Sequence, residues 1–299
     1  MTPSILVSPF GLALDALPAG THFFGTAVKL EPLSDAYKAR LIEYLDRVGE
    51  DNLSKHARKR PIFNIPIKDV AAIKGAGTPV DQSDYALNIH RFAMDYFSNV
   101  HTPMASFYFD GEHVQSHSVD FRDLLFRDGQ ELELPTGAWE KGSAYLNFAY
   151  GALDRAPLAR LAITRTCRAA RQGPNGDGII DLAIALESLL SANTEIKFQF
   201  SLFHALLRTD ALADREDAFA LLRDLYDCRS LFAHGGVAGK SSKTKIKNVT
   251  ARWNDLIGLA RDNLTYYLAY CTGNEHAEWD AHVNRLAMGA PRIVIGAAA

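Results

Sequence analysis

Residues 215–234 have the sequence REDAFALLRDLYDCRSLFAH, and this stretch predicts a long amphipathic helix. Acidic side chains open it, where they suit the positive end of the helix dipole. Phe219, Leu222 and Tyr226 recur at helical spacing and share one face. Arg229 falls on the same apolar stripe, where a guanidinium needs an anionic partner or a route to the surface. Two glycines follow at once and predict the end of the helix.

Helical patterns continue on both sides of this stretch, from about residue 144 onward, and strand signals vanish. Turn-forming residues separate five expected helices, at 144–171, 178–192, 195–209, 214–234 and 249–272. The segment GPNGDG at 173–178 lacks the lysine and hydroxyl residue of a phosphate-binding loop, and it predicts a turn between helices. We therefore expect an all-α helical bundle over 144–273, followed by a C-terminal tail over 274–299.

The first 138 residues have a mixed pattern, which predicts an α+β domain over 1–138. Three stretches favour strands, namely 23–30, 105–109 and 113–121. Two others carry apolar residues at helical spacing, namely 34–48 and 84–100. His113 and His117 lie four residues apart, but their spacing matches no zinc motif, so neither a metal nor another cofactor is expected.

Length and composition favour an ordinary globular protein of two domains. The chain has 299 residues, of which 47% are hydrophobic and 22% charged, and this excludes wholesale disorder. A net charge of −3 excludes a protein that coats nucleic acid, so any contact with RNA must be local. Three dispersed cysteines, the lack of a basic signal sequence and the lack of an apolar run of about 18 residues predict a cytoplasmic protein with no membrane contact.

Arg229 and His234 form an RxxxxH pattern at the end of the expected helix. Five residues turn a regular helix so that the two side chains point about 140° apart. The helix end, or a second copy of the chain, must therefore unite them. The alternative is an ion-paired arginine and a histidine that the helix dipole favours. Glu187 shares a face with apolar residues, so we expect it to pair with Arg229, unless it is partly exposed.

Three segments together resemble the ApeA-like branch of the HEPN superfamily: DLAIALESLL (181–190), EIKFQFSLFHALL (195–207) and FALLRDLYDCRSLFAHGG (219–236). LYDCRSLFAHGG is the most specific part. The resemblance implies a helical bundle that dimerises through the helices bearing the RxxxxH motif. It implies a catalytic pair in Arg229 and His234, with Ser230 as the polar residue after the arginine. The family often has an arginine in the second segment, where this chain has Phe203 and His204, so the contact made by that arginine is in doubt.

Many HEPN domains are metal-independent ribonucleases of defence or toxin systems, and the residue types here suit that chemistry. Histidine titrates near neutral pH and can move a proton, and arginine grips phosphate through two parallel N–H groups. A lysine-rich stretch follows the motif, and we expect a flexible loop that holds the RNA backbone; its residues are Lys240, Lys243, Lys245 and Lys247. The alternative is a solvated linker.

The sequence thus predicts a metal-independent endoribonuclease that acts on RNA as a homodimer in a defence or toxin-like system. Its N-terminal domain would sense a trigger or restrain the nuclease, a role that rests on analogy with the family. One alternative is a non-catalytic HEPN module that binds RNA, a nucleotide or a protein partner. Another is an N-terminal enzyme for which the bundle is only a dimerisation platform.

Overall fold

The computed structural model describes eleven stretches of the chain: 4–9, 22–24, 28–32, 34–49, 58, 63–66, 104–110, 113–119, 138–190, 196–235 and 239–293. The chain divides into two compact units, Met1–Gly151 and Ala152–Ala299. The predicted helix at 84–100 lies outside the described residues. Within the described part of the chain, no helix is long and apolar enough to cross a membrane.

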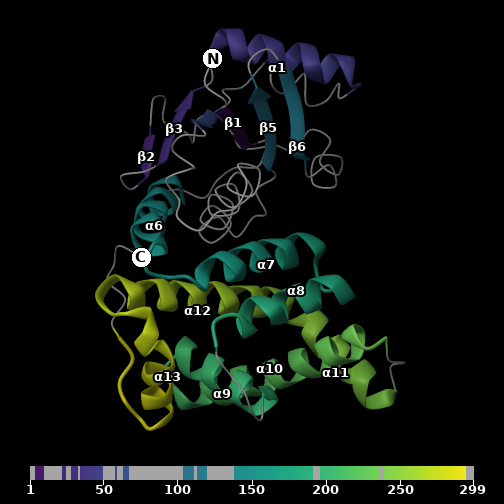
Figure 1. Cartoon of the computed structure of the whole chain (residues 1–299). Coiled ribbons are helices and arrows are strands. Elements are labelled where there is room, and N and C mark those ends of the chain that lie inside the picture. The colour runs from purple at the N-terminus through teal and green to yellow at the C-terminus, as the bar shows by residue number, and fades with distance from the viewer. Residues whose placement is uncertain are drawn as a thin grey trace. The chain divides into compact units, whose positions relative to one another are not determined.

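The first unit contains six strand segments, which the structure describes by their backbone alone (Figure 1). They are β1 Ser4–Pro9, β2 His22–Phe24, β3 Val28–Pro32, β4 Phe63–Pro66, β5 Met104–Asp110 and β6 His113–Val119. All pair antiparallel, in the order β2-β3-β4-β1-β5-β6. Two helices are described here, α1 Asp35–Arg47 and α6 Ala138–Leu153. Helix α1 buries Leu41 and Leu45.

The predicted fold class, an α+β domain before an all-α bundle, is wrong for the part of the chain whose side chains the structure describes. That part is 82% helix and contains neither a strand nor a sheet, whereas the six strand segments are described by their backbone alone. A domain is defined by a hydrophobic core packed between layers. The period-two patterns of the first half predicted strands, but a backbone ladder alone does not establish such a core. Only the helical bundle of the second unit is therefore assigned as a fold.

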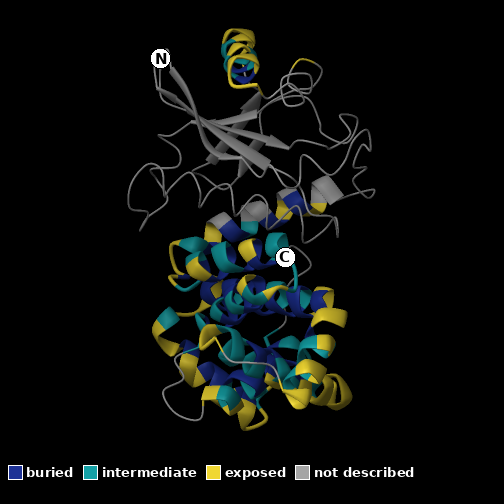
Figure 2. Cartoon of the chain, turned by 90° about the vertical axis from the view of Figure 1, so that its right-hand side faces the viewer, coloured by how far each residue is buried: buried dark blue, intermediate teal, exposed yellow. Residues whose placement is uncertain are grey.

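The second unit is a helical bundle, as expected, and its buried residues lie toward the inside of the bundle (dark blue in Figure 2). Its helices are α7 Ala159–Gln172, α8 Gly176–Glu187, α9 Ile196–Arg208, α10 Leu212–Ala233, α11 Lys240–Ala251, α12 Trp253–Gly273, the short 3₁₀ helix η2 His276–Glu278 and α13 Trp279–Ala287. Helix α10 contributes Leu221, Leu222 and Leu225 to the central core. Of the predicted apolar stripe, Leu222 is therefore buried in the core, whereas Phe219 and Tyr226 pack against it and are partly buried.

The first expected helix of the bundle, 144–171, is in fact two helices. Helix α6 ends at Leu153 and α7 begins at Ala159. Pro157 lies in the break, where its missing N–H and its ring prevent a continuous helix. The predicted turn at 173–178 covers residues 173–175 only, since α8 begins at Gly176. Gly173 has φ +71°, and the Asn175 side chain caps α8 by accepting the N–H of Gly178 at 2.8 Å.

The described part of the segment predicted as a C-terminal tail, up to Ile293, packs within the second unit. Trp279 of α13 is only 1% exposed, and its indole N–H donates to the carbonyl oxygen of Leu189 at 2.6 Å. Further along, the Arg292 guanidinium donates to the carbonyl oxygen of Leu207 at 2.6 Å. The backbone N–H of Ile293 donates to the hydroxyl of Tyr266 at 2.9 Å. Residues 279–293 therefore belong to the bundle.

Candidate functional site

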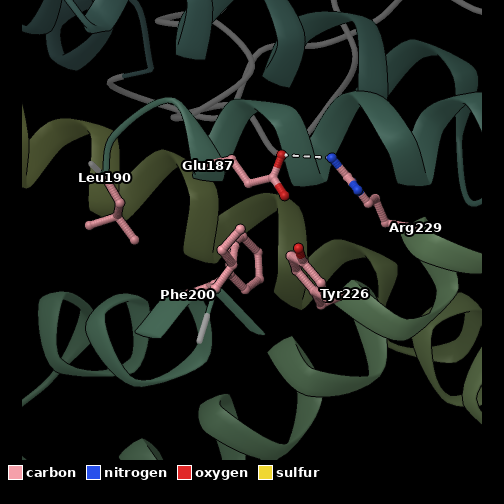
Figure 3. Close-up of a pocket in the computed structure, with 6 residues that line it drawn as sticks. Glu187, Leu190, Phe200, Tyr226 and Arg229 are labelled. Carbon is pink, nitrogen blue, oxygen red and sulfur yellow. Dashed lines mark hydrogen bonds and ion pairs between the residues drawn. The ribbon is translucent and has the colours of Figure 1, made fainter. Parts of the chain in front are cut away.

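Arg229 and Glu187 form the ion pair that the sequence predicts. The guanidinium Nη2 of Arg229, on α10, donates to Oε2 of Glu187, the last residue of α8, at 3.2 Å (Figure 3). The two side chains are 28% and 24% exposed, so the predicted alternative of partial exposure also holds for Glu187. Because water screens such a pair, it stabilises the fold by at most about 1 kcal/mol.

His204 fixes the end of α8 that carries Glu187. Its Nε2 lies 3.0 Å from the carbonyl oxygen of Leu186, and its Nδ1 lies 2.9 Å from the side-chain amide nitrogen of Asn263 on α12. Complete burial lowers the pKa of His204 to about 3, against the opposing effect of the hydrogen bond to Leu186. The neutral ring thus donates through Nε2 and accepts through Nδ1. His204 supplies no cation in place of the arginine that the resembling family often has in this segment.

A pocket of about 320 Å³ opens beside the ion pair, between α8, α9 and α10 (Figure 3). It is lined by Glu187, Leu190, Ile196, Phe200, Tyr226 and Arg229. The Phe200 and Tyr226 rings are 5.4 Å apart between centroids, and the guanidinium carbon of Arg229 lies 5.6 Å from the centre of the Tyr226 ring. The pocket therefore combines an apolar, aromatic wall with a carboxylate and a guanidinium at one edge.

His234 lies at the C-terminal end of α10 and is exposed. Its backbone N–H donates to the carbonyl oxygen of Ser230 at 3.2 Å, and Gly235 follows with φ +63°, the left-handed residue expected there. Ser230 itself is half-buried. Among the described residues, His234 does not line the pocket that holds Arg229. One chain thus brings Arg229 to Glu187 but does not bring His234 to that pocket.

The lysine-rich stretch is a helix, so the prediction of a flexible loop is wrong. Lys240, Lys243 and Lys247 are exposed in α11 and share one face, at helical spacing of three and then four residues. Lys245 is half-buried on another face, and its ammonium group donates to Asp227 of α10 at 2.5 Å. Three of the four predicted lysines therefore form an exposed basic face, whereas Lys245 is an ion-pair partner.

Polar contacts of α10 with α11, and with Arg252 directly after it, explain why the lysine-rich stretch is helical. The contacts are Asp217 with Arg252 through two bonds of 2.7 Å, Asp224 with Asn248 at 2.7 Å, and Asp227 with Lys245 at 2.5 Å. Asp227 also pairs with Lys197 of α9 at 2.5 Å. Burial raises the pKa of Asp227, but hydrogen bonds from Lys197 and Lys245 outweigh it, and the pKa is lowered. The carboxylate is therefore ionised at neutral pH and ties three helices together.

The sequence carried a signal for this arrangement that the prediction missed. Acidic residues recur at 217, 224 and 227, and their partners run in the opposite direction at 252, 248 and 245. The order of the partners is reversed, and the steps from 224 to 227 and from 248 to 245 are both three residues, as expected for two antiparallel helices that share one polar seam. Comparison of the two patterns would have placed Lys245 in that seam.

Comparisons with known proteins give no match. Neither a scan against protein-family models nor searches of curated proteins and of solved structures identify a relative. The resemblance to ApeA-like HEPN domains therefore stays a prediction, and the roles of Arg229, Ser230 and His234 depend on the residues themselves.

Proposed function

We propose that the chain is a metal-independent endoribonuclease of HEPN type, with Arg229 holding the scissile phosphate and His234 moving the proton. The main support for this proposal is that the Arg229 guanidinium is accessible to a ligand. Its guanidinium is partly exposed in an open pocket, and the hydrogen bond recorded for it among the described residues uses Nη2. The N–H groups on Nε and Nη1 can therefore grip a phosphate while Glu187 keeps the group in place.

The proposed reaction needs no group beyond RNA and the two side chains. The 2′-oxygen of a ribose attacks the adjacent phosphorus, and the bond from phosphorus to the 5′-oxygen breaks. The 2′-hydroxyl proton passes to the His234 imidazole acting as base, and the imidazolium formed in this way gives a proton to the leaving 5′-oxygen. The products are a 2′,3′-cyclic phosphate and a 5′-hydroxyl. The fixed charge of Arg229 stabilises the extra negative charge on the phosphoryl oxygens in the transition state.

A homodimer completes the site in this proposal. Since His234 lies outside the pocket of its own chain, a second copy must bring its exposed α10 end to the Arg229 pocket. The three free, buried cysteines suit a reducing compartment, and we place the protein in the cytoplasm, in a defence or toxin-like role. That setting rests on the family resemblance.

Purified chain is expected to cut single-stranded RNA in the presence of EDTA. The reaction uses an internal nucleophile and protein cations, so chelation of divalent metals should leave the rate unchanged. Gel analysis of a labelled RNA, with the 2′,3′-cyclic phosphate end identified by mass spectrometry, measures this. Cleavage that stops in EDTA, or that leaves 5′-phosphate ends, contradicts the proposal.

The exposed lysines of α11 are expected to hold the RNA backbone. Replacing Lys240, Lys243 and Lys247 together with Gln should reduce the slope of log affinity against log salt by about 2, since each phosphate contact on single strands contributes about 0.7. Fluorescence anisotropy at several salt concentrations measures the slope. Lys245→Gln is the matched control: it should keep the slope, because this lysine is already paired with Asp227. An equal change of the slope in both variants would contradict the expectation that the exposed lysines contact the RNA backbone.

A non-catalytic binding module is the second candidate. It is favoured by the separation of His234 from the Arg229 pocket within one chain. RNA binding that depends on the α11 lysines, without cutting at any protein concentration that supports dimers, would establish this candidate instead.

A further inference from the structure

The Glu187–Arg229 pocket has the composition of a site for one flat, polar ring. Its volume of about 320 Å³ lies at the lower end of the range of small-ligand sites, about 300–1,000 Å³. Tyr226 presents aromatic surface, the buried Phe200 ring packs behind it at 1% exposure, and Leu190 and Ile196 add aliphatic surface. Such a wall suits a single unpaired nucleobase, which exposes two apolar faces and one hydrogen-bonding edge.

The polar edge of the pocket determines which base fits. Glu187 is a pure acceptor when ionised, and the hydrogen bond recorded for it in the described part of the chain uses Oε2, which leaves Oε1 and further lone pairs of Oε2 for a ligand. Figure 3 shows the carboxylate above the Phe200 and Tyr226 rings, with the Tyr226 hydroxyl directed toward the ion pair. A ligand held by the rings must therefore present hydrogen-bond donors to Glu187.

Guanine satisfies this requirement and the other bases do not. Its Watson–Crick edge has two neighbouring donors, the ring N1–H and the exocyclic N2 amine, which match the two oxygens of one carboxylate. Adenine and cytosine place a ring acceptor beside their amine, and uracil places its ring N–H between two carbonyl groups. Each of these would set an acceptor against the Glu187 carboxylate, which leaves polar groups unpaired.

We propose that this pocket binds an unpaired guanine of the RNA substrate, with Glu187 accepting hydrogen bonds from N1 and N2. The proposal rests on the proposed nuclease function, since it makes this base the one beside the phosphate that Arg229 holds. Cleavage is then directed to phosphates adjacent to guanine in single-stranded RNA. Glu187 thus acts as the specificity-determining residue, and the partly exposed Tyr226 ring, backed by the buried Phe200 ring, holds the base face.

The test measures binding apart from cleavage. The probes are short, uridine-rich 2′-O-methyl RNAs that differ at one central position, which is guanine, inosine or adenine. Blocking the 2′-oxygen removes the nucleophile, so the affinity is measured on intact RNA. Inosine lacks only the N2 amine, and its loss should weaken binding of the wild-type chain about tenfold, the effect of one charge-assisted hydrogen bond. Adenine should bind at least as weakly as inosine.

Glu187→Gln should abolish the difference between guanine and inosine, because an amide NH₂ group then faces the donors of the base. Glu216→Gln is the matched control, since Glu216 is exposed on α10 and does not line the pocket. Equal affinity of the wild type for guanine and inosine, or a guanine preference that survives in Glu187→Gln, overturns the proposal. Absence of binding to every probe overturns it as well.

The two proposals fail in different ways. A chain that cuts RNA without preference for guanine retains the nuclease function and loses the assignment of the pocket. A chain that prefers guanine but cuts no RNA in EDTA retains the pocket and loses the nuclease function.

Discussion

RNA cleavage in EDTA falls about 100-fold or more when either Arg229 or His234 is replaced by Ala. General acid–base catalysis by one side chain contributes about 10²–10⁴-fold, and a fixed cation on the developing charge contributes a similar factor. Rates of cleavage of a labelled RNA, measured with enzyme in excess, give these factors directly. Arg223→Ala is the matched control, because Arg223 lies exposed on the same helix, against Phe219, and does not line the pocket. Cutting at the wild-type rate by either site variant would refute the assignment.

A mixture of the two inactive variants tests the dimer. If His234 of one copy serves the Arg229 pocket of the other, a mixed dimer of Arg229→Ala and His234→Ala keeps one intact composite site. Mixing should therefore restore part of the activity that each variant lacks. No recovery, in a mixture shown to exchange subunits, would mean that the two residues do not act across an interface.

Trp279→Ala is expected to lower the free energy of unfolding by about 3–5 kcal/mol, the usual effect of removing a buried tryptophan side chain. The ring is packed at 4.9 Å from Tyr267 and 5.1 Å from Tyr270, between ring centroids. Its indole N–H donates to Leu189, so the substitution also leaves a carbonyl oxygen without this donor. The loss of unfolding free energy should therefore be much larger than that caused by a substitution at an exposed position.

Urea unfolding followed by circular dichroism measures this change. The matched control is Met288→Ala, which lies just after α13 and is 79% exposed, and which should alter stability by less than about 0.5 kcal/mol. A loss below about 1 kcal/mol for Trp279→Ala would show that α13 unfolds separately from the rest of the bundle.

The sequence was most informative where a single helix carries a full apolar stripe. Helix α10 was predicted at 214–234 and spans Leu212–Ala233, because its leucines face the core and glycine ends it. The Arg229–Glu187 pair was predictable for a related reason, since a charged side chain among apolar neighbours is usually paired with one of opposite charge. The position of this ion pair beside an open pocket could not be predicted, because the pocket is formed by three helices that only tertiary packing brings together.

The sequence was less informative where distant residues decide the local structure. The segment KSSKTKIKN at 240–248 has few apolar residues, and its helix is fixed by carboxylates of α10. Helix α13 could have been found, since Trp279, Val283 and Leu286 lie at helical spacing and are buried. Asp181 sits within the predicted helix 178–192, but its burial between Arg165 and Arg168 of α7 depends on how α7 packs against α8.

The buried imidazole of His204 makes the bundle sensitive to acid, although it takes no part in the proposed reaction. In the folded chain this ring stays uncharged down to pH about 3, whereas a freely hydrated histidine takes up a proton below about 6.5. Between these values the unfolded chain therefore binds more protons than the folded chain, and stability declines as the solution is acidified. At neutral pH the ring is uncharged, and its hydrogen bonds join the end of α8 to Asn263 of α12.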